Sequence, residues 1–161
     1  IYFFHMKLFL FLWVMSIQIF SVTLNVNVTR VIDGDTLYVN DEQGQRHKVR
    51  LWGIDAPELT QRDGAQSGRF LGVLVGGKSV KIKVVDTDRY GRWIAKVYDE
   101  NNLYLNEEMV RLGLAWVYDF YVQDQQPSWN YYQDLAKAKK IGVWRRRSPI
   151  PPWDYRQKKS K

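Results

Sequence analysis

The spacing of apolar and polar positions predicts short β-strands over most of the first hundred residues. VTLNVNVTRVI (22–32) alternates apolar and polar side chains, the period of two that is typical of a half-buried strand. TLYVN (36–40) and RHKVRLWGI (46–54) repeat this alternation after DGD and DEQGQ, which favour turns. Two further segments alternate in the same way, KSVKIKVV (78–85) and RWIAKVYD (92–99). We therefore expect five strands, the first three joined as a meander.

Three other segments show helical spacing. DGAQSGRFLGVLV (63–75) carries apolar side chains on one helical face and is followed by two glycines that end a helix. LNEEMVRLG (105–113) and PSWNYYQDLAKAKKIG (127–142) are also predicted helices, the second with proline near its start and basic residues near its end. Strands with interleaved helices predict an α+β protein, a five-stranded OB-fold-type β-barrel with about three packed helices. Residues 147–161 are basic and proline-rich, so we expect an extended tail there.

The N-terminal segment has the pattern of a targeting sequence. MKLFLFLWVMSIQIFSVT places one lysine before an apolar run of about a dozen residues, which favours a secretory signal over residues 1–22. The run is short for a membrane span. We therefore expect a secreted or periplasmic protein. An uncleaved N-terminal membrane anchor is the alternative.

Charge and composition narrow the chemistry. The 24 lysines and arginines exceed the 17 aspartates and glutamates, for a net charge of +7, which favours a polyanionic partner such as nucleic acid or an anionic membrane. The chain has no cysteine and only two histidines, His5 and His47, which excludes disulfides and thiolate sites and argues against a histidine zinc site. Carboxylates, arginines, lysines and tyrosines remain, the partners of hard cations and of phosphate.

Carboxylates occur at two predicted strand–turn corners. VIDGDTLYV places Asp33 and Asp35 at one corner, and VRLWGIDAPEL places Asp55 and Glu58 at another, where Pro57 ends strand pairing. If both corners lie at the same end of the barrel, the carboxylates converge and require a cation to hold them together. Ligands that are all oxygen suggest Ca²⁺ or Mg²⁺. Each motif is also a common turn sequence for conformational reasons alone.

A third motif adds positive charge. In DTDRYGRWIAKVY, Arg89 and Arg92 flank Tyr90 at the entry to a predicted strand. Guanidinium groups bind phosphate in a planar, bidentate manner and keep their charge at any relevant pH. A solvated turn in which Asp88 pairs with a nearby arginine is the alternative interpretation.

The three motifs in this order, VIDGDT, VRLWGIDAPE and DRYGR, resemble the staphylococcal nuclease (thermonuclease) family. LNEEMVRLGLAWVY and KKIGVW resemble the C-terminal half of that family. The resemblance covers roughly residues 25 to 146, so we place the domain at 23–146. SPIPPWDY in the tail is similar to small exported members from Gram-negative bacteria.

The resemblance implies a calcium site. In the family, the aspartate that closes DGD and the aspartate of D-x-P-E are calcium ligands, which here are Asp35 and Asp55. The next residue contributes its backbone carbonyl. This chain has Ala56 where the family often has threonine, a difference that leaves the carbonyl ligand in place.

The resemblance also implies the catalytic groups. Glu58 corresponds to the general base that acts on the attacking water. Arg50 and Arg92 correspond to the arginines that bind the scissile phosphate and stabilise the charge of its transition state. This assignment agrees with the chemistry of phosphodiester hydrolysis, which needs an activated water and preorganised positive charge.

Three further residues are implied as substrate contacts. Tyr90 corresponds to a tyrosine that touches a substrate phosphate, and Arg89 lies near the terminal phosphate. A tyrosine after GLAWVY stacks on a base in the family. Tyr121 aligns best with it, and Tyr118 is the alternative.

The residues and the resemblance together predict a monomeric, calcium-dependent, sugar-nonspecific nuclease that acts on DNA and RNA. The resemblance implies that its cleavage leaves 3′-phosphate ends. The main alternative is a noncatalytic nucleic-acid-binding module of the same fold. The residues that would carry catalysis are all present, which favours the enzyme; they are Asp35, Arg50, Asp55, Glu58 and Arg92. A membrane-tethered protein that presents a basic face to lipid does not explain the carboxylates. We expect no stable membrane association unless the leader is uncleaved.

Overall fold

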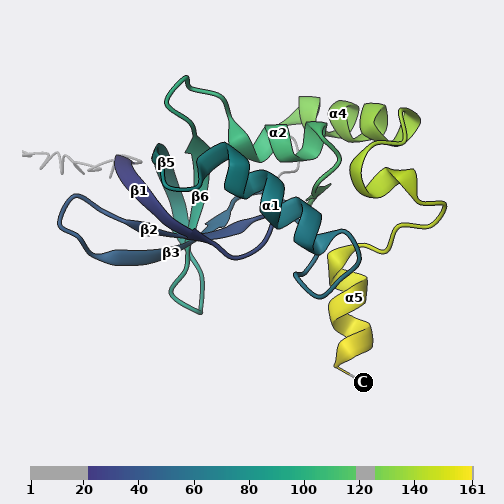
Figure 1. The fold of residues 1–161 in the computed structure, drawn as a ribbon, viewed down its shortest axis with the longest axis horizontal. Coiled ribbons are helices and arrows are strands. Elements are labelled where there is room, and N and C mark those ends of the chain that lie inside the picture. Colours follow the sequence, from purple (N-terminus) through teal and green to yellow (C-terminus); the bar gives the residue numbers. More distant parts are fainter. Residues whose placement is uncertain (1–21, 119–125, 161) are drawn as a thin grey trace, which may run out of the picture.

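The computed structural model describes residues 22–118 and 126–160. Five strands form a closed barrel in which all neighbours are antiparallel except β3 and β6, which are parallel. Their order around the barrel is β1 (Thr23–Val31), β2 (Thr36–Asn40), β3 (Arg46–Leu51), β6 (Trp93–Tyr98) and β5 (Ser79–Thr87) (Figure 1). The predicted α+β fold on a five-stranded barrel is confirmed.

The alternation of the sequence accounts for the barrel interior. Every second residue of the strands is apolar and almost fully buried, for example Val26 and Val28 in β1, Leu37 and Val39 in β2, and Ile82 in β5. Burial of each such side chain contributes about 1.5–3 kcal/mol of transfer free energy. A register shift of one residue would expose the whole set, so the same pattern that predicts the strands also fixes their pairing.

The third predicted strand, 46–54, is divided in the structure. β3 ends at Leu51, and the chain turns at Gly53, whose φ of 76° is easily adopted only by glycine. It then forms β4 (Ile54–Asp55), which pairs outside the barrel with β7 (Trp116–Val117). The prediction of one continuous strand is therefore wrong at its end. The break matters for the candidate site, because it places Asp55 at the rim of the barrel.

The three predicted helices are present; one passes in front of the barrel in Figure 1, and the other two lie together toward its upper right. α1 (Gly64–Val75) crosses the barrel and buries Leu71 against it. α2 (Leu105–Arg111) packs against α4 (Pro127–Ala138), where the fully buried Trp129 donates its indole N–H to Glu107 at 3.0 Å. A short 3₁₀ helix, η2 (Gly142–Arg145), follows.

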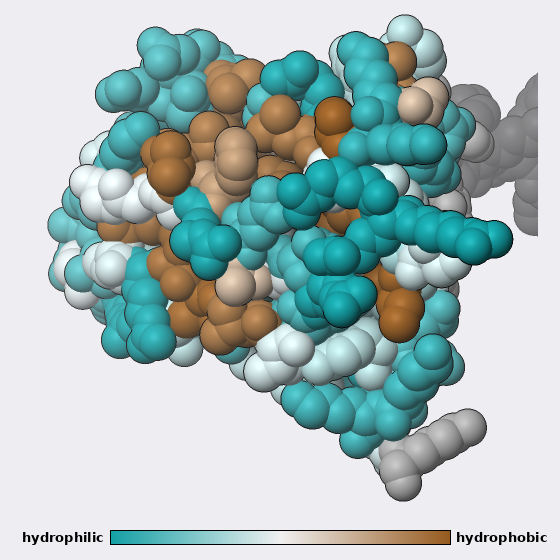
Figure 2. All heavy atoms as spheres, turned by 45° about the vertical axis from the view of Figure 1, so that its right-hand side comes forward, coloured by the Kyte–Doolittle hydropathy of each residue, from teal (hydrophilic) through white to brown (hydrophobic). Residues whose placement is uncertain are grey.

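The expectation of an extended tail over 147–161 is wrong for residues 152–159. These residues form a further helix, α5 (Pro152–Lys159), which lies at the lower end of the molecule in Figures 1 and 2 and is mainly hydrophilic there. Proline in its first turn and basic residues in its last turn are both favourable in a helix. The Tyr155 hydroxyl lies 3.1 Å from the hydroxyl of Thr60, which holds α5 against the loop that follows β4.

The predicted leader, apart from its last residue, lies outside the described residues. Among the helices of 22–118 and 126–160, none is long and apolar enough to cross a membrane.

Candidate active site

The two carboxylate corners lie at the same end of the barrel, as predicted. The Ala56 amide, in the second corner, donates a 2.6 Å hydrogen bond to Asp35 Oδ2, in the first. Arg50, near the end of β3, pairs with Asp35 through one guanidinium nitrogen and with Asp55 Oδ1 at 2.8 Å through another. Neither carboxylate is exposed beyond 2%. A single arginine thus joins the two corners.

Two glycines allow the corners to approach so closely. A Cβ on Gly34, in the DGD turn, would overlap the hydroxyl of Ser67 on α1 and would lie 2.8 Å from the Ala56 Cβ. A Cβ on Gly64, the first residue of α1, would overlap the carbonyl oxygen of Glu58. Both positions therefore require glycine, and both set the position of residues expected to act.

The electrostatics of this corner keep Asp35 and Arg50 charged. Burial opposes ionisation of Asp35, but the Arg50 guanidinium and the Ala56 amide outweigh it and hold the pKa of Asp35 below its ordinary value. Burial likewise opposes the charge of Arg50, and the carboxylates of Asp35 and Asp55 raise its pKa above the ordinary value. The corner is a buried ion cluster whose members depend on one another.

The pKa of Asp33 shifts in the opposite direction to the pKa of Asp35. Burial, and then the neighbouring charge of Asp35, raise the pKa of Asp33 from 3.8 to about 7. Its Oδ1 accepts the backbone N–H of Asp35 at 3.1 Å, so it also shapes the turn. Near neutral pH a large fraction of molecules therefore carry Asp33 protonated, which limits the negative charge beside Asp35.

A cavity of about 400 Å³ opens in front of this cluster. Its wall contains most of the residues that the sequence singles out, namely Asp35, Arg50, Ala56, Glu58, Arg89, Tyr90 and Arg92. Asp55 lies behind the wall, fully buried under its two arginine partners. Tyr118 also lines the cavity, whereas Tyr121 lies outside the described residues.

The DRYGR turn contains the ion pair of the alternative interpretation, in which Asp88 pairs with an arginine of the turn. Asp88 accepts the backbone amides of Tyr90 and Arg92 at 2.9 and 3.0 Å, which closes the turn. Its other oxygen accepts Nε of Arg92 at 2.7 Å. Burial opposes ionisation of Asp88, but this bond and the two backbone bonds together outweigh it and hold the pKa of Asp88 below its ordinary value. Within the described part of the chain, Arg92 makes no second ion pair, so its terminal nitrogens remain free for an anion. Asp88 therefore both folds the turn and orients Arg92.

The structure adds one residue that sequence reasoning missed. Arg156, on α5, donates from Nη2 to Asp55 Oδ2 at 2.7 Å and from Nη1 to Glu58 Oε1 at 2.7 Å and Asp55 Oδ1 at 3.1 Å. The bonds to Asp55, then those to Glu58, raise the pKa of Arg156 despite partial burial. The sequence predicts an extended tail here, and no local signal indicates that this segment has a place in the site.

The donor set has the chemistry of a hard-cation site. Two aspartates, Asp35 and Asp55, and the carbonyl of Ala56 would supply only oxygen ligands, which suit Ca²⁺. In the structure, Arg50 and Arg156 pair with these acids. Across residues 22–118 and 126–160, no three acidic or histidine side chains are gathered closely enough to hold a metal ion. A cation would therefore take the place of a guanidinium, and the nearest exposed one belongs to Arg156.

Comparisons with known proteins identify the family. The family model described as staphylococcal nuclease homologue matches residues 48–146. An "Uncharacterized endonuclease" of Escherichia coli O157:H7 is 38% identical over 152 residues, which cover 94% of this chain and 95% of that protein. Another protein of that name, from Haemophilus influenzae, is 40% identical over 81% of this chain and 71% of its own. A "Probable staphylococcal-like nuclease" of Oryza sativa subsp. japonica is 41% identical over 70% of this chain and 29% of its own length. The chain therefore belongs to the staphylococcal nuclease family.

Proposed function

We propose that this protein is a calcium-dependent nuclease that hydrolyses phosphodiester bonds in both DNA and RNA. The observation that carries the proposal is one cavity in which Glu58 lies beside Arg50 and Arg92, in front of the Asp35–Asp55 corner. Membership of the family and the nuclease names of its relatives support the same reaction class.

Asp35, Asp55 and the carbonyl of Ala56 would hold the cation, which when bound supplies positive charge beside the scissile phosphate. Glu58 is the base of the reaction. Its carboxylate accepts a proton from a water whose oxygen attacks phosphorus, while the bond from phosphorus to the 5′ oxygen breaks. The 5′ oxygen leaves and takes a proton from solvent water, and the phosphate stays on the 3′ side. The proposed products are therefore 3′-phosphate ends.

Arg50 and Arg92 stabilise the charge that develops on the phosphate oxygens. Arg50 is held in place by two buried aspartates, and Arg92 by Asp88, so both guanidinium groups are oriented before substrate arrives. Preorganised donors of this kind contribute about 10²–10³-fold each to the rate.

The side chains at the cavity suit contacts with the sugar–phosphate backbone of a nucleic acid and with any base. The Tyr90 ring is 69% exposed at the cavity, with the guanidinium carbons of Arg89 and Arg92 at 4.9 and 5.6 Å from its centre. Arginines bind phosphates, and an exposed aromatic ring can stack on any base. Neither contact depends on the nucleotide sequence. We therefore propose cleavage that is indifferent to the sugar, with Tyr118 or Tyr121 as a further stacking surface.

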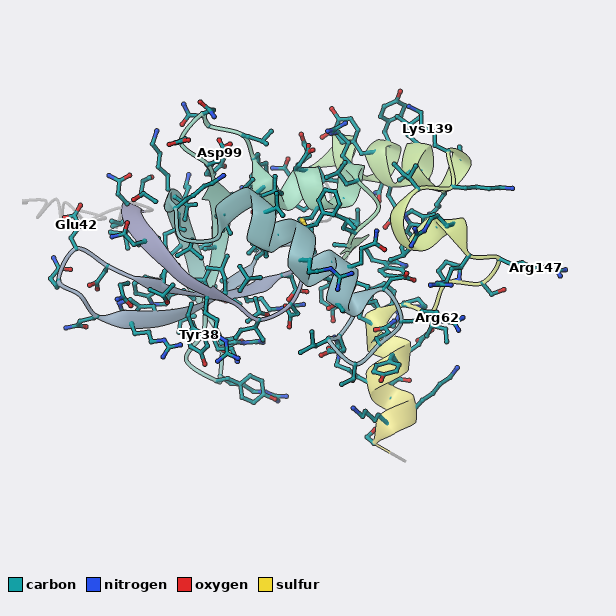
Figure 3. The ribbon with its side chains drawn as sticks, in the orientation of Figure 1. Tyr38, Glu42, Arg62, Asp99, Lys139 and Arg147 are labelled. Carbon is teal, nitrogen blue, oxygen red and sulfur yellow. The ribbon has the colours of Figure 1, made fainter. Side chains whose placement is uncertain are left out.

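The proposal is tested by digestion of single-stranded DNA and of RNA with Ca²⁺, with Mg²⁺ and with chelator, for wild type and Glu58→Gln. We expect cleavage that needs Ca²⁺ and falls about 10²–10⁴-fold in the variant, the range for loss of a general base. Glu42→Gln is the matched control, because Glu42 lies in the β2–β3 turn, at the opposite end of the molecule from α5 (Figure 3). Tight binding without cleavage under every metal would instead support a noncatalytic binding module.

We further propose that the protein is exported and acts as a monomer. The lysine and apolar run within residues 1–22 support export to the periplasm or the medium, with N-terminal anchoring as the alternative. Cell fractionation distinguishes these locations, and sedimentation of the mature protein measures its oligomeric state.

A further inference from the structure

One side chain from the C-terminal helix binds both acids of the DAPE corner. Arg156 contacts Asp55 through two nitrogens and Glu58 through one, at 2.7 to 3.1 Å. These acids are the proposed cation ligand and the proposed base. Charge-assisted bonds of this length are the strong ones, so Arg156 belongs to the site and is not a passing surface contact.

α5 stays beside the cavity independently of this contact. The Tyr155 hydroxyl donates to the Thr60 carbonyl at 3.2 Å, and Lys159 Nζ reaches the Thr60 hydroxyl at 3.2 Å. The side-chain amide of Gln61 donates to the Ile150 carbonyl at 2.7 Å, just before the helix. These bonds all attach to the loop that carries Glu58. If Arg156 releases the acids, the helix still holds its guanidinium at the mouth of the cavity.

A cation at Asp55 and the present position of Arg156 exclude each other. Both Asp55 oxygens accept Arg156, and Oδ1 also accepts Arg50, so the carboxylate has no oxygen free of a guanidinium. A bound cation would place a second positive charge against Arg156 at the same oxygens, and like charges at such a distance repel. Of the two arginines, Arg156 is the one able to move, since its side chain is 43% exposed against 18% for Arg50.

We propose that Arg156 is a substrate-binding residue, whose guanidinium passes from Asp55 and Glu58 to the substrate's phosphate once a cation is held. This inference rests on the proposed function. The released group is a positive charge in a cavity that already contains Arg50, Arg89 and Arg92, and it needs an anion. A phosphate in the cavity is the complementary partner, because a guanidinium binds it in the same bidentate manner as a carboxylate.

Two binding measurements on Arg156→Ala test the exchange, and they should change in opposite directions. Calorimetric titration without nucleotide should show Ca²⁺ binding about tenfold tighter than in wild type, because the competing guanidinium is gone. With Ca²⁺ saturating, deoxythymidine 3′-phosphate, which carries the proposed product end, should bind about tenfold more weakly, because one charged phosphate donor is lost. Arg156→Lys keeps the positive charge but loses the planar pair of N–H donors. Its two affinities should fall between those of Arg156→Ala and wild type.

Lys158→Ala is the matched control, since Lys158 lies exposed on the same helix and makes no contact with the site. It should leave both affinities unchanged. If Arg156→Ala weakens both affinities, or changes neither while its thermal unfolding matches wild type, Arg156 has a structural role only and the inference is wrong. Either result leaves the nuclease proposal standing as long as Glu58→Gln still abolishes cleavage.

Discussion

Asp55 and Asp63 are each held by two arginines, yet the two groups lie in opposite surroundings. Asp55 is fully buried, and its arginines come from distant parts of the chain, β3 and α5. Asp63 stands just before α1, and its arginines come from one run, residues 145–147. The Arg146 Nε atom lies 2.6 Å from Asp63 Oδ2, a distance similar to the 2.7 Å between Arg156 Nη2 and Asp55 Oδ2 at the active site.

The difference lies in the charges that surround each pair. Around Asp55, the acids Asp35 and Glu58 also share the two arginines, so the group has an excess of negative charge that a cation can neutralise. Around Asp63, one acid faces a run of three arginines, and Arg147 projects away from the molecule (Figure 3). The same kind of ion pair thus belongs to the proposed cation site in one place. In the other it fastens the C-terminal segment to α1.

The largest effect is expected on the rate of cleavage, when one arginine from each region is replaced. Arg92→Ala should lower the rate of cleavage about 10²–10³-fold, because it removes a preorganised donor to the transition state. Arg147→Ala removes the same side chain from the other region and should change the rate less than about threefold, the scale of a surface charge. Steady-state cleavage of a short single-stranded DNA measures both. Comparable losses in the two variants would show that general basicity, and not the cavity, accounts for cleavage.

A smaller effect is expected on stability at Asp63. Hydrogen bonding from Arg146 holds the pKa of Asp63 below its ordinary value of 3.8, so its contribution to stability is present above that pH and is lost as pH falls through the folded pKa. Asp63→Asn should therefore lower the thermal midpoint by about 1–4 °C at pH 7, as expected for a partly exposed pair. The difference from wild type should shrink below about pH 4. A difference that stays constant with pH would mean that the pair does not stabilise the fold through charge.

Much of the barrel and of the site could be predicted from sequence, because the relevant signals are local. Alternation marks the strands, and Asp35, Arg50 and Glu58 stand in motifs at the ends of those strands. The division of strand 46–54 was missed because the apolar run continues through Gly53, and only the positive φ there reveals the turn. Whether the two corners meet stayed a condition at the level of sequence, because it depends on how the closed barrel brings distant strand ends together.

The position of α5 could not be predicted in this way. Pro152 marks a helix start, but the helix is short and strongly polar, so no apolar face indicates what it packs against. Its place is set by single hydrogen bonds to residues nearly a hundred positions away, such as the bond of Arg156 to Glu58 across 98 positions. Such contacts leave no periodic pattern in the sequence.

The most direct test of the proposed cation site compares Asp55→Asn with Asp63→Asn in one assay, Ca²⁺-dependent digestion of single-stranded DNA. The two substitutions remove the same charge from two carboxylates that each hold two arginines. Asp55→Asn should lose at least about 10²-fold in rate, since it removes a proposed cation ligand, and Asp63→Asn should stay within about twofold of wild type. Full Ca²⁺-dependent activity in Asp55→Asn would contradict the assignment of this corner as the site of cleavage.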